Sequence, residues 1–168
     1  RPVTRVSQVL EQRARLLMHP AFAVAAYVVV MSVWHIPALY DAALEHGVIH
    51  VFEHICFLSA GLLYWWHLLS PIRSPLRGGP FAPVVYMLAT KLLVGMLGIV
   101  ITFAPDPLYD FYVDAPRVWS LSPLDDQAVA GAIMAVEQSI VMGIVLAWLF
   151  VRALGESQRA DERAERYG

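Results

Sequence analysis

The chain has 168 residues, of which 58% are hydrophobic and only 15% are charged, with a formal net charge of −2. Because soluble globular domains carry about 25% charged residues, this composition excludes an ordinary soluble domain. The single cysteine, Cys56, excludes a disulfide within the chain and any CxxC metal motif. The chain begins at Arg1 rather than Met, so we expect either a removed N-terminus or a trimmed piece of a longer sequence.

Four stretches are apolar enough to cross a bilayer, which takes roughly 20 mostly apolar residues. The sequence predicts spans at about residues 20–40, 47–69, 82–103 and 123–152. The prolines and glycines of residues 70–80 predict a loop. Residues 153–168 alternate charges at helical spacing and predict a solvated helix end on the cytoplasmic side. We therefore expect an all-α fold, a polytopic membrane helical bundle of four transmembrane helices forming one domain over residues 1–168.

Local signals mark the ends of the first and fourth spans. Pro20 suits the first position of a helix, and Pro37 is expected to bend the end of that span. Ser122 is a candidate N-cap of the fourth span, with Pro123 in its first turn and Asp125 three residues after the cap. These signals place the helix starts more firmly than hydropathy alone.

Basic residues predict the orientation, because Lys and Arg in short flanks favour the cytoplasmic side. Arginines gather before the first span, between the second and third spans, and after the fourth. The other two connections are acidic and contain Arg117 alone. Since the three basic segments fall on one side of an even-numbered bundle, we expect both termini in the cytoplasm.

Histidines are concentrated at the start of the second span, in HGVIHVFEHICF (residues 46–57). His50 and His54 are four residues apart and share one helical face, and His35 on the first span reaches a comparable depth. Buried imidazoles need partners in lipid, and imidazole suits copper, zinc, iron or nickel. Metal binding, structural hydrogen bonding and haem ligation all remain open for these residues. His46, near the helix end, is expected to be hydrogen-bonded to a neighbour.

The fourth span offers further polar groups. Met134 is either a packing residue or a thioether ligand suited to Cu(I), and Asp126 either shares its face or stabilises the helix N-terminus. Glu137 lies well inside the span, so we expect it to be paired, protonated or beside a bound metal. Lys91, in the third span, has three options: pairing with Glu137, pairing with Glu53, or reaching out toward the membrane surface.

Four segments together resemble the CtaG-like family of bacterial cytochrome c oxidase assembly factors. They are WHIPALYDAAL (34–44), HxxxHxxF (50–57), GLLYWWHLLSP (61–71) and LSPLDDQAVAGAIM (121–134), and the likeness extends over about residues 16–152. The resemblance implies metal ligation by the three histidines and a supporting role for the DQ…GxxM segment. Taken with the residues above, the candidate ligands are His35, His50, His54 and Met134, supported by Asp126, Gln127, Glu137 and Glu53.

The resemblance implies a protein of the bacterial inner membrane that binds copper and supports oxidase biogenesis, with zinc or iron as alternative metals. No nucleophile–base–oxyanion arrangement, phosphate-binding glycine loop or dinucleotide motif is present, so we expect no enzyme. Expected partners are the lipid bilayer and either oxidase subunits or another membrane complex, without nucleic acid. Family members carry further N-terminal spans, which a partner chain would have to supply.

Two other functions remain open at the level of sequence. One is a structural accessory subunit of a larger respiratory or photosynthetic membrane complex, which the glycine-containing helix faces favour. The other is a haem or quinone electron-transfer subunit. Both would use the same helical bundle.

Overall fold

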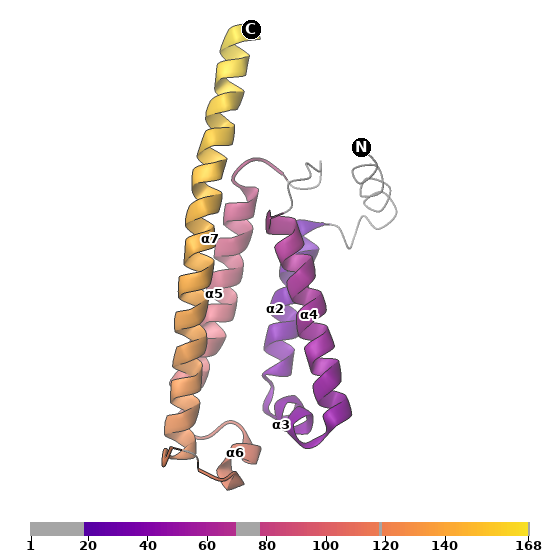
Figure 1. Cartoon of the computed structure of the whole chain (residues 1–168), viewed down its shortest axis with the longest axis vertical. Coiled ribbons are helices and arrows are strands. Elements are labelled where there is room, and N and C mark those ends of the chain that lie inside the picture. The colour runs from indigo at the N-terminus through magenta and orange to yellow at the C-terminus, as the bar shows by residue number, and fades with distance from the viewer. Residues whose placement is uncertain (1–18, 70–77, 118, 168) are drawn as a thin grey trace.

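The computed structural model describes residues 19–69, 78–117 and 119–167, so the predicted basic flank at residues 1–18 and most of the predicted loop lie outside the described residues (Figure 1). Within this part the structure contains helices and no strand. The helices are α2 (Pro20–Trp34), α3 (Pro37–Glu45), α4 (Gly47–Leu69), α5 (Ala82–Thr102), α6 (Asp110–Asp114) and α7 (Pro123–Tyr167). The predicted all-α fold is confirmed.

Three of the described helices, α4, α5 and α7, are long and apolar enough to cross a membrane. The pair α2 and α3 passes the same test together, although its two helices are bent by 72°. The described part of the chain therefore has three candidate spans, or four when the bent pair is counted as one. The expected membrane bundle is confirmed, with its first span broken.

The break in the first span corrects the predicted end near residue 40. Ile36 adopts an extended conformation, with φ −66° and ψ 127°, directly before Pro37. The ring of a proline disfavours helical geometry in the residue that precedes it, so α2 ends at Trp34 and a new helix begins at Pro37. As a result, α3 turns away from α2 and continues to Glu45.

The bundle consists of two helix pairs, α2 with α4 and α5 with α7, which meet mainly through α2 and α5 (Figure 1). The buried core includes Tyr64, Met87 and Met142. The rings of Tyr27 and Tyr64 stack with centroids 4.7 Å apart. This packing fixes α4 against α2, and thereby sets the position of the histidines that α4 carries.

Two glycines allow α5 and α7 to approach closely. A Cβ on Gly131 would lie 2.7 Å from the backbone nitrogen of Thr102, and one on Gly98 would lie 3.1 Å from the Gly131 carbonyl oxygen. Gly95 and Gly143, which the sequence offers equally, have open space around them. The closest contact of the two helices is therefore at Gly98 and Gly131, as small residues permit in membrane helices.

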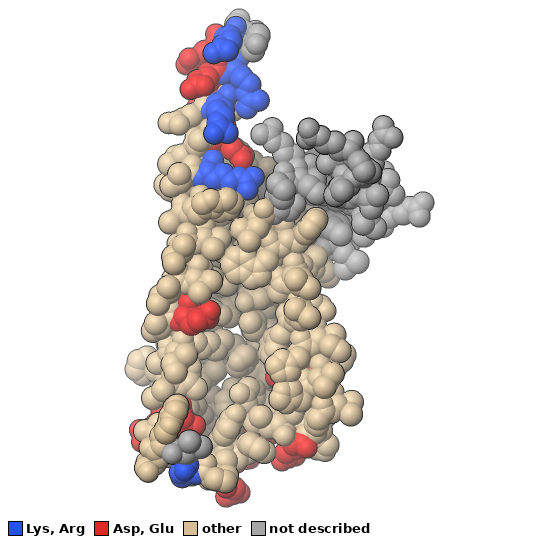
Figure 2. Space-filling model, in the orientation of Figure 1, with Lys and Arg blue, Asp and Glu red and all other residues tan. Residues whose placement is uncertain are grey.

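The last helix, α7, starts as its capping residues predict. The N–H of Asp125 donates to the Ser122 hydroxyl at 3.1 Å, and that hydroxyl donates to the Asp125 carboxylate at 2.6 Å. The helix then continues without a break through the charged tail to Tyr167. In Figure 2 the arginines of the tail gather at one end of the molecule, where acidic groups lie beside them, and the end that holds α3 and α6 is mostly acidic.

Candidate metal centre

The first turns of α4 bring two imidazoles and a carboxylate together. His50, Glu53 and His54 each offer one ligand atom, and these atoms all lie within 4.8 Å of one another. The rings of His50 and His54 stack with centroids 4.6 Å apart and an interplanar angle of 22°. Spacings of three and four residues place all three side chains on one helical face, so a continuous helix is sufficient to build this cluster.

The two rings already share a contact that a metal can replace. The Nε2 atoms of His50 and His54 lie 2.7 Å apart, so one of them donates a hydrogen bond to the other. In a tetrahedral site with metal–nitrogen bonds of about 2.0–2.1 Å, two ligand nitrogens are about 3.3 Å apart. The rings would therefore separate by only about 0.6 Å to hold one ion, which side-chain rotation provides. The donor set fits a transition metal.

Burial differs among the three groups. Both imidazoles are exposed, whereas Glu53 is buried, with 9% of its surface accessible. A buried carboxylate requires a compensating partner, and a cation held by the neighbouring imidazoles would supply positive charge. The cluster thus has a buried anionic side and an accessible imidazole side.

His35 joins this cluster from the end of α2. It lines a cavity of about 280 Å³ together with His50, Glu53, His54 and Tyr40. Its Nδ1 lies 2.6 Å from the Met31 carbonyl oxygen. Since a carbonyl only accepts, Nδ1 carries the proton, and Nε2 of the neutral ring is free of hydrogen and able to ligate. The structure therefore places the three predicted histidines around one cavity.

The candidates from α7 line a second cavity, of about 260 Å³. Asp126, Gln127 and Met134 form one wall, and His35 and Tyr40 belong to both cavities. Met134 also packs against the hydrophobic core. Apart from Glu137, which lines neither, the predicted site residues thus divide between two cavities that share His35 and Tyr40, and the structure does not gather them in one.

Gln127 holds the connection between α5 and α6. Its side-chain oxygen accepts from the Leu108 N–H at 2.6 Å, and its amide nitrogen donates to the carbonyls of Ile101 at 3.3 Å and Asp106 at 3.5 Å. The side chain is buried, with 9% of its surface accessible. Gln127 therefore fixes the backbone on either side of Pro107, which lines the second cavity.

Tyrosines that the sequence alone does not single out lie beside His35. The Tyr109 hydroxyl donates to the His35 carbonyl oxygen at 3.3 Å, and the rings of Tyr40 and Tyr109 have centroids 4.2 Å apart. Asp41 accepts from the Asp110 N–H at 3.1 Å and ties α3 to α6. The aromatic run YDFY at residues 109–112 was the available signal, but its contact with α3 depends on the tertiary fold.

The remaining candidates lie outside these two cavities. Glu137 is exposed on α7, where it is the only charged residue between Asp126 and Arg152. Lys91 donates to the Ser139 hydroxyl at 3.1 Å, a partner outside the three options expected from the sequence. His46 is hydrogen-bonded through Nδ1 to the Ala42 carbonyl at 3.2 Å, as expected.

Comparison with known protein families gives a match. The family model of the cytochrome c oxidase caa3 assembly factor (Caa3_CtaG) matches residues 1–156. No curated protein and no solved structure matches the chain. Because the family model covers nearly the whole sequence, this chain belongs to the caa3-type cytochrome c oxidase assembly factor family.

Proposed function

We propose that this chain binds copper in the cavity formed by His35, His50, Glu53 and His54, and passes it to cytochrome c oxidase during assembly. The observation that carries the proposal is the convergence of the ligand atoms of His50, Glu53 and His54 within 4.8 Å. Family membership supports the oxidase as the recipient. Imidazole and carboxylate together suit a transition metal rather than calcium or magnesium.

The proposed location is the bacterial inner membrane, with both termini in the cytoplasm. The clustering of arginines at the far end of α7 from α3 and α6 supports this orientation (Figure 2). The cavity would then lie toward the outer face of the membrane.

The proposed mechanism is ligand exchange without a covalent intermediate or an enzymatic step. Copper is the cargo, and the exposed imidazoles of His50 and His54 allow ligands of a recipient protein to reach it. Met134 lines the neighbouring cavity, to which His35 also belongs, and offers a thioether that suits Cu(I). A recipient with more, or softer, ligands would remove the ion because it binds more tightly.

The test is elemental mass spectrometry of the full chain purified from native membranes. Wild-type protein is compared with a His50→Ala/His54→Ala double variant and with His46→Ala, which removes an exposed histidine near the start of the same helix. We expect copper in the wild type and in His46→Ala, and its loss in the double variant. Absence of transition metal from the wild type, or copper retained by the double variant, would overturn the site.

A competition experiment addresses the identity of the metal. The apo-protein is offered equal concentrations of Cu(I) and Zn²⁺ under anaerobic conditions, and the bound metal is measured after desalting. Copper should be retained in preference. Preferential retention of zinc would overturn the copper proposal while leaving the histidine site in place.

A further inference from the structure

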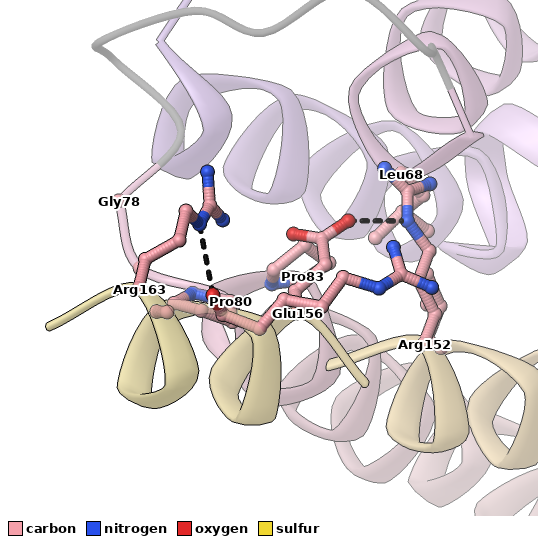
Figure 3. Close-up of a pocket in the computed structure, with 11 residues that line it drawn as sticks. Leu68, Gly78, Pro80, Pro83, Arg152, Glu156 and Arg163 are labelled. Atoms are coloured by element: carbon pink, nitrogen blue, oxygen red, sulfur yellow. Dashed lines mark hydrogen bonds and ion pairs between the residues drawn. The ribbon is translucent and has the colours of Figure 1, made fainter. Parts of the chain in front are cut away.

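A third cavity, of about 340 Å³, lies where the end of α4 and the start of α5 meet the charged part of α7 (Figure 3). We call it the arginine pocket, and its charged lining consists of Arg152, Glu156, Arg159 and Arg163. Leu68 and Pro83 contribute to its apolar wall. In Figure 3, Arg163 and Arg152 lie on opposite sides of Glu156 and Pro83.

The sequence of α7 sorts its charges around the helix. At 3.6 residues per turn, Arg152, Arg159 and Arg163 fall within an arc of about 40°. Asp161 and Glu165 fall on the opposite side and do not line the pocket. Three guanidinium groups against the single Glu156 carboxylate leave a charge of +2 in the lining. The pocket is therefore built to attract an anion.

Internal contacts use only part of this donor capacity. The Nε of Arg152 donates to the Glu156 carboxylate at 3.0 Å, and the Nε of Arg163 donates to the Arg159 carbonyl at 2.8 Å. Each guanidinium has five N–H donors in a planar fork. Both of these contacts use the inner nitrogen, Nε, and the two terminal nitrogens take no part in them. The terminal nitrogens remain suited to the bidentate geometry with which arginine binds phosphate.

The pocket also adjoins apolar surface of the kind that faces lipid. Trp148 is 49% exposed, and the Arg152 guanidinium carbon lies 5.6 Å from the centroid of its ring. Leu69, which follows the lining residue Leu68, is 43% exposed. In Figure 2 the blue groups of the tail begin where the largely tan surface of the bundle ends. This is the level at which a phospholipid would hold its phosphate, with acyl chains along the helices.

We propose that the arginine pocket binds the phosphate headgroup of an anionic phospholipid. Phosphate is the shared chemistry of lipid headgroups and soluble phosphates, and the adjoining apolar surface identifies the lipid as the source. A charge of +2 selects anionic lipids over phosphatidylcholine, whose choline would add a further cation. This proposal does not rest on the proposed copper site, which lies at the other end of the bundle.

Native mass spectrometry of the full chain tests the site. The protein in detergent is titrated with phosphatidylglycerol, with phosphatidylcholine, or with inorganic phosphate as a soluble probe. Arg163→Gln is matched by Arg166→Gln, which makes the same charge change on the same helix outside the pocket. Because each arginine near a membrane surface contributes about 1 kcal/mol to anionic lipid binding, an Arg159→Gln/Arg163→Gln variant should bind phosphatidylglycerol roughly 30-fold more weakly.

The expected pattern is selective retention of phosphatidylglycerol by the wild type and by Arg166→Gln, with weaker retention by Arg163→Gln and the double variant. An Arg159→Lys/Arg163→Lys variant, which keeps the charge but loses the bidentate fork, should bind phosphatidylglycerol more tightly than the glutamine pair and more weakly than the wild type, and shows that the helix still folds. Equal retention by Arg163→Gln and Arg166→Gln, or equal binding of the two lipids, would overturn the site. Inorganic phosphate displacing phosphatidylglycerol at equal concentration would overturn the lipid as its source.

Discussion

The Nε2 atoms of His50 and His54 lie at hydrogen-bonding distance, 2.7 Å apart, on successive turns of α4. A neutral pair can make this contact only if one ring carries its proton on Nε2 and the other on Nδ1. Binding one metal through both Nε2 atoms requires the donor ring to move its proton to Nδ1. The proposed binding of one ion by both rings would therefore require a change of tautomer in one of them.

Nitrogen-15 NMR of histidine-labelled protein detects this change. In the metal-free protein we expect one of the two residues to be protonated on Nε2, and both to be protonated on Nδ1 after loading with diamagnetic Cu(I). His35, whose Nδ1 faces the Met31 carbonyl, should keep its tautomer throughout. Observation of Nδ1 protonation in both rings before loading would contradict the hydrogen bond.

Glu53→Gln keeps the size of the buried side chain and removes its negative charge. We expect copper affinity to fall by about 10–100-fold, the range found when groups next to metal ligands are changed. Competition with a copper chelator gives the measurement. Glu45→Gln, at the exposed end of α3, is the control and should leave the affinity unchanged.

Gln127→Ala should destabilise the connection between α5 and α6. The change leaves the Leu108 N–H and the Ile101 carbonyl without the partner that now satisfies them, which costs about 1–3 kcal/mol for a buried polar group. Hydrogen exchange should increase at residues 106–109. Gln158→Ala, on the exposed tail, should leave this exchange unchanged, and equal protection in both variants would show that Gln127 does not hold the connection.

Gly131→Ala should lower the thermal stability of the bundle. The added Cβ would lie 2.7 Å from the backbone nitrogen of Thr102, and overpacking of this kind costs about 1–3 kcal/mol. Gly143→Ala makes the same change on the same helix in open space. A lower midpoint of thermal unfolding is expected for Gly131→Ala alone. Equal midpoints in the two variants would mean that α5 and α7 can move apart at Gly131 without loss of stability.

The Tyr109 hydroxyl should lose its proton at a higher pH than an ordinary tyrosine. Burial, followed by the nearby charge of Asp41, raises its pKa from the usual 10.0 to about 12. The folded state thus favours the neutral phenol, a stabilisation that is complete below pH 10 and is lost as the pH rises toward 12. Ultraviolet titration of the wild type minus Tyr109→Phe should show a phenolate signal with a midpoint near this value, and a midpoint at 10 would place the ring in water.

Helix positions were predictable where the signal is local. The second span was expected at residues 47–69, which are the bounds of α4, and Ser122 caps α7 as its spacing with Asp125 indicates. The bend after α2 was partly predictable, because Pro37 restricts Ile36. Its size of 72° was not, since it depends on how α3 packs against α4 and α6.

The candidate site was likewise predictable where the signal is local, and not where it depends on tertiary contacts. His50 and His54 meet because they are one turn apart on a single helix, which the sequence states directly. The separation of Met134 from them depends on where α2 places His35 between two cavities. No local pattern encodes that placement, and the roles of Gln127 and Tyr109 likewise arise from contacts between distant segments.

The unbroken length of α7 makes it a lever with unequal arms about its close crossing with α5. Gly131 lies five residues from Asp126, about 8 Å along the axis, and 32 residues from Arg163, about 48 Å. Any tilt about this crossing would therefore displace Arg163 about six times as far as Asp126. A sub-ångström adjustment beside the second cavity corresponds to a movement of several ångströms at the arginine pocket.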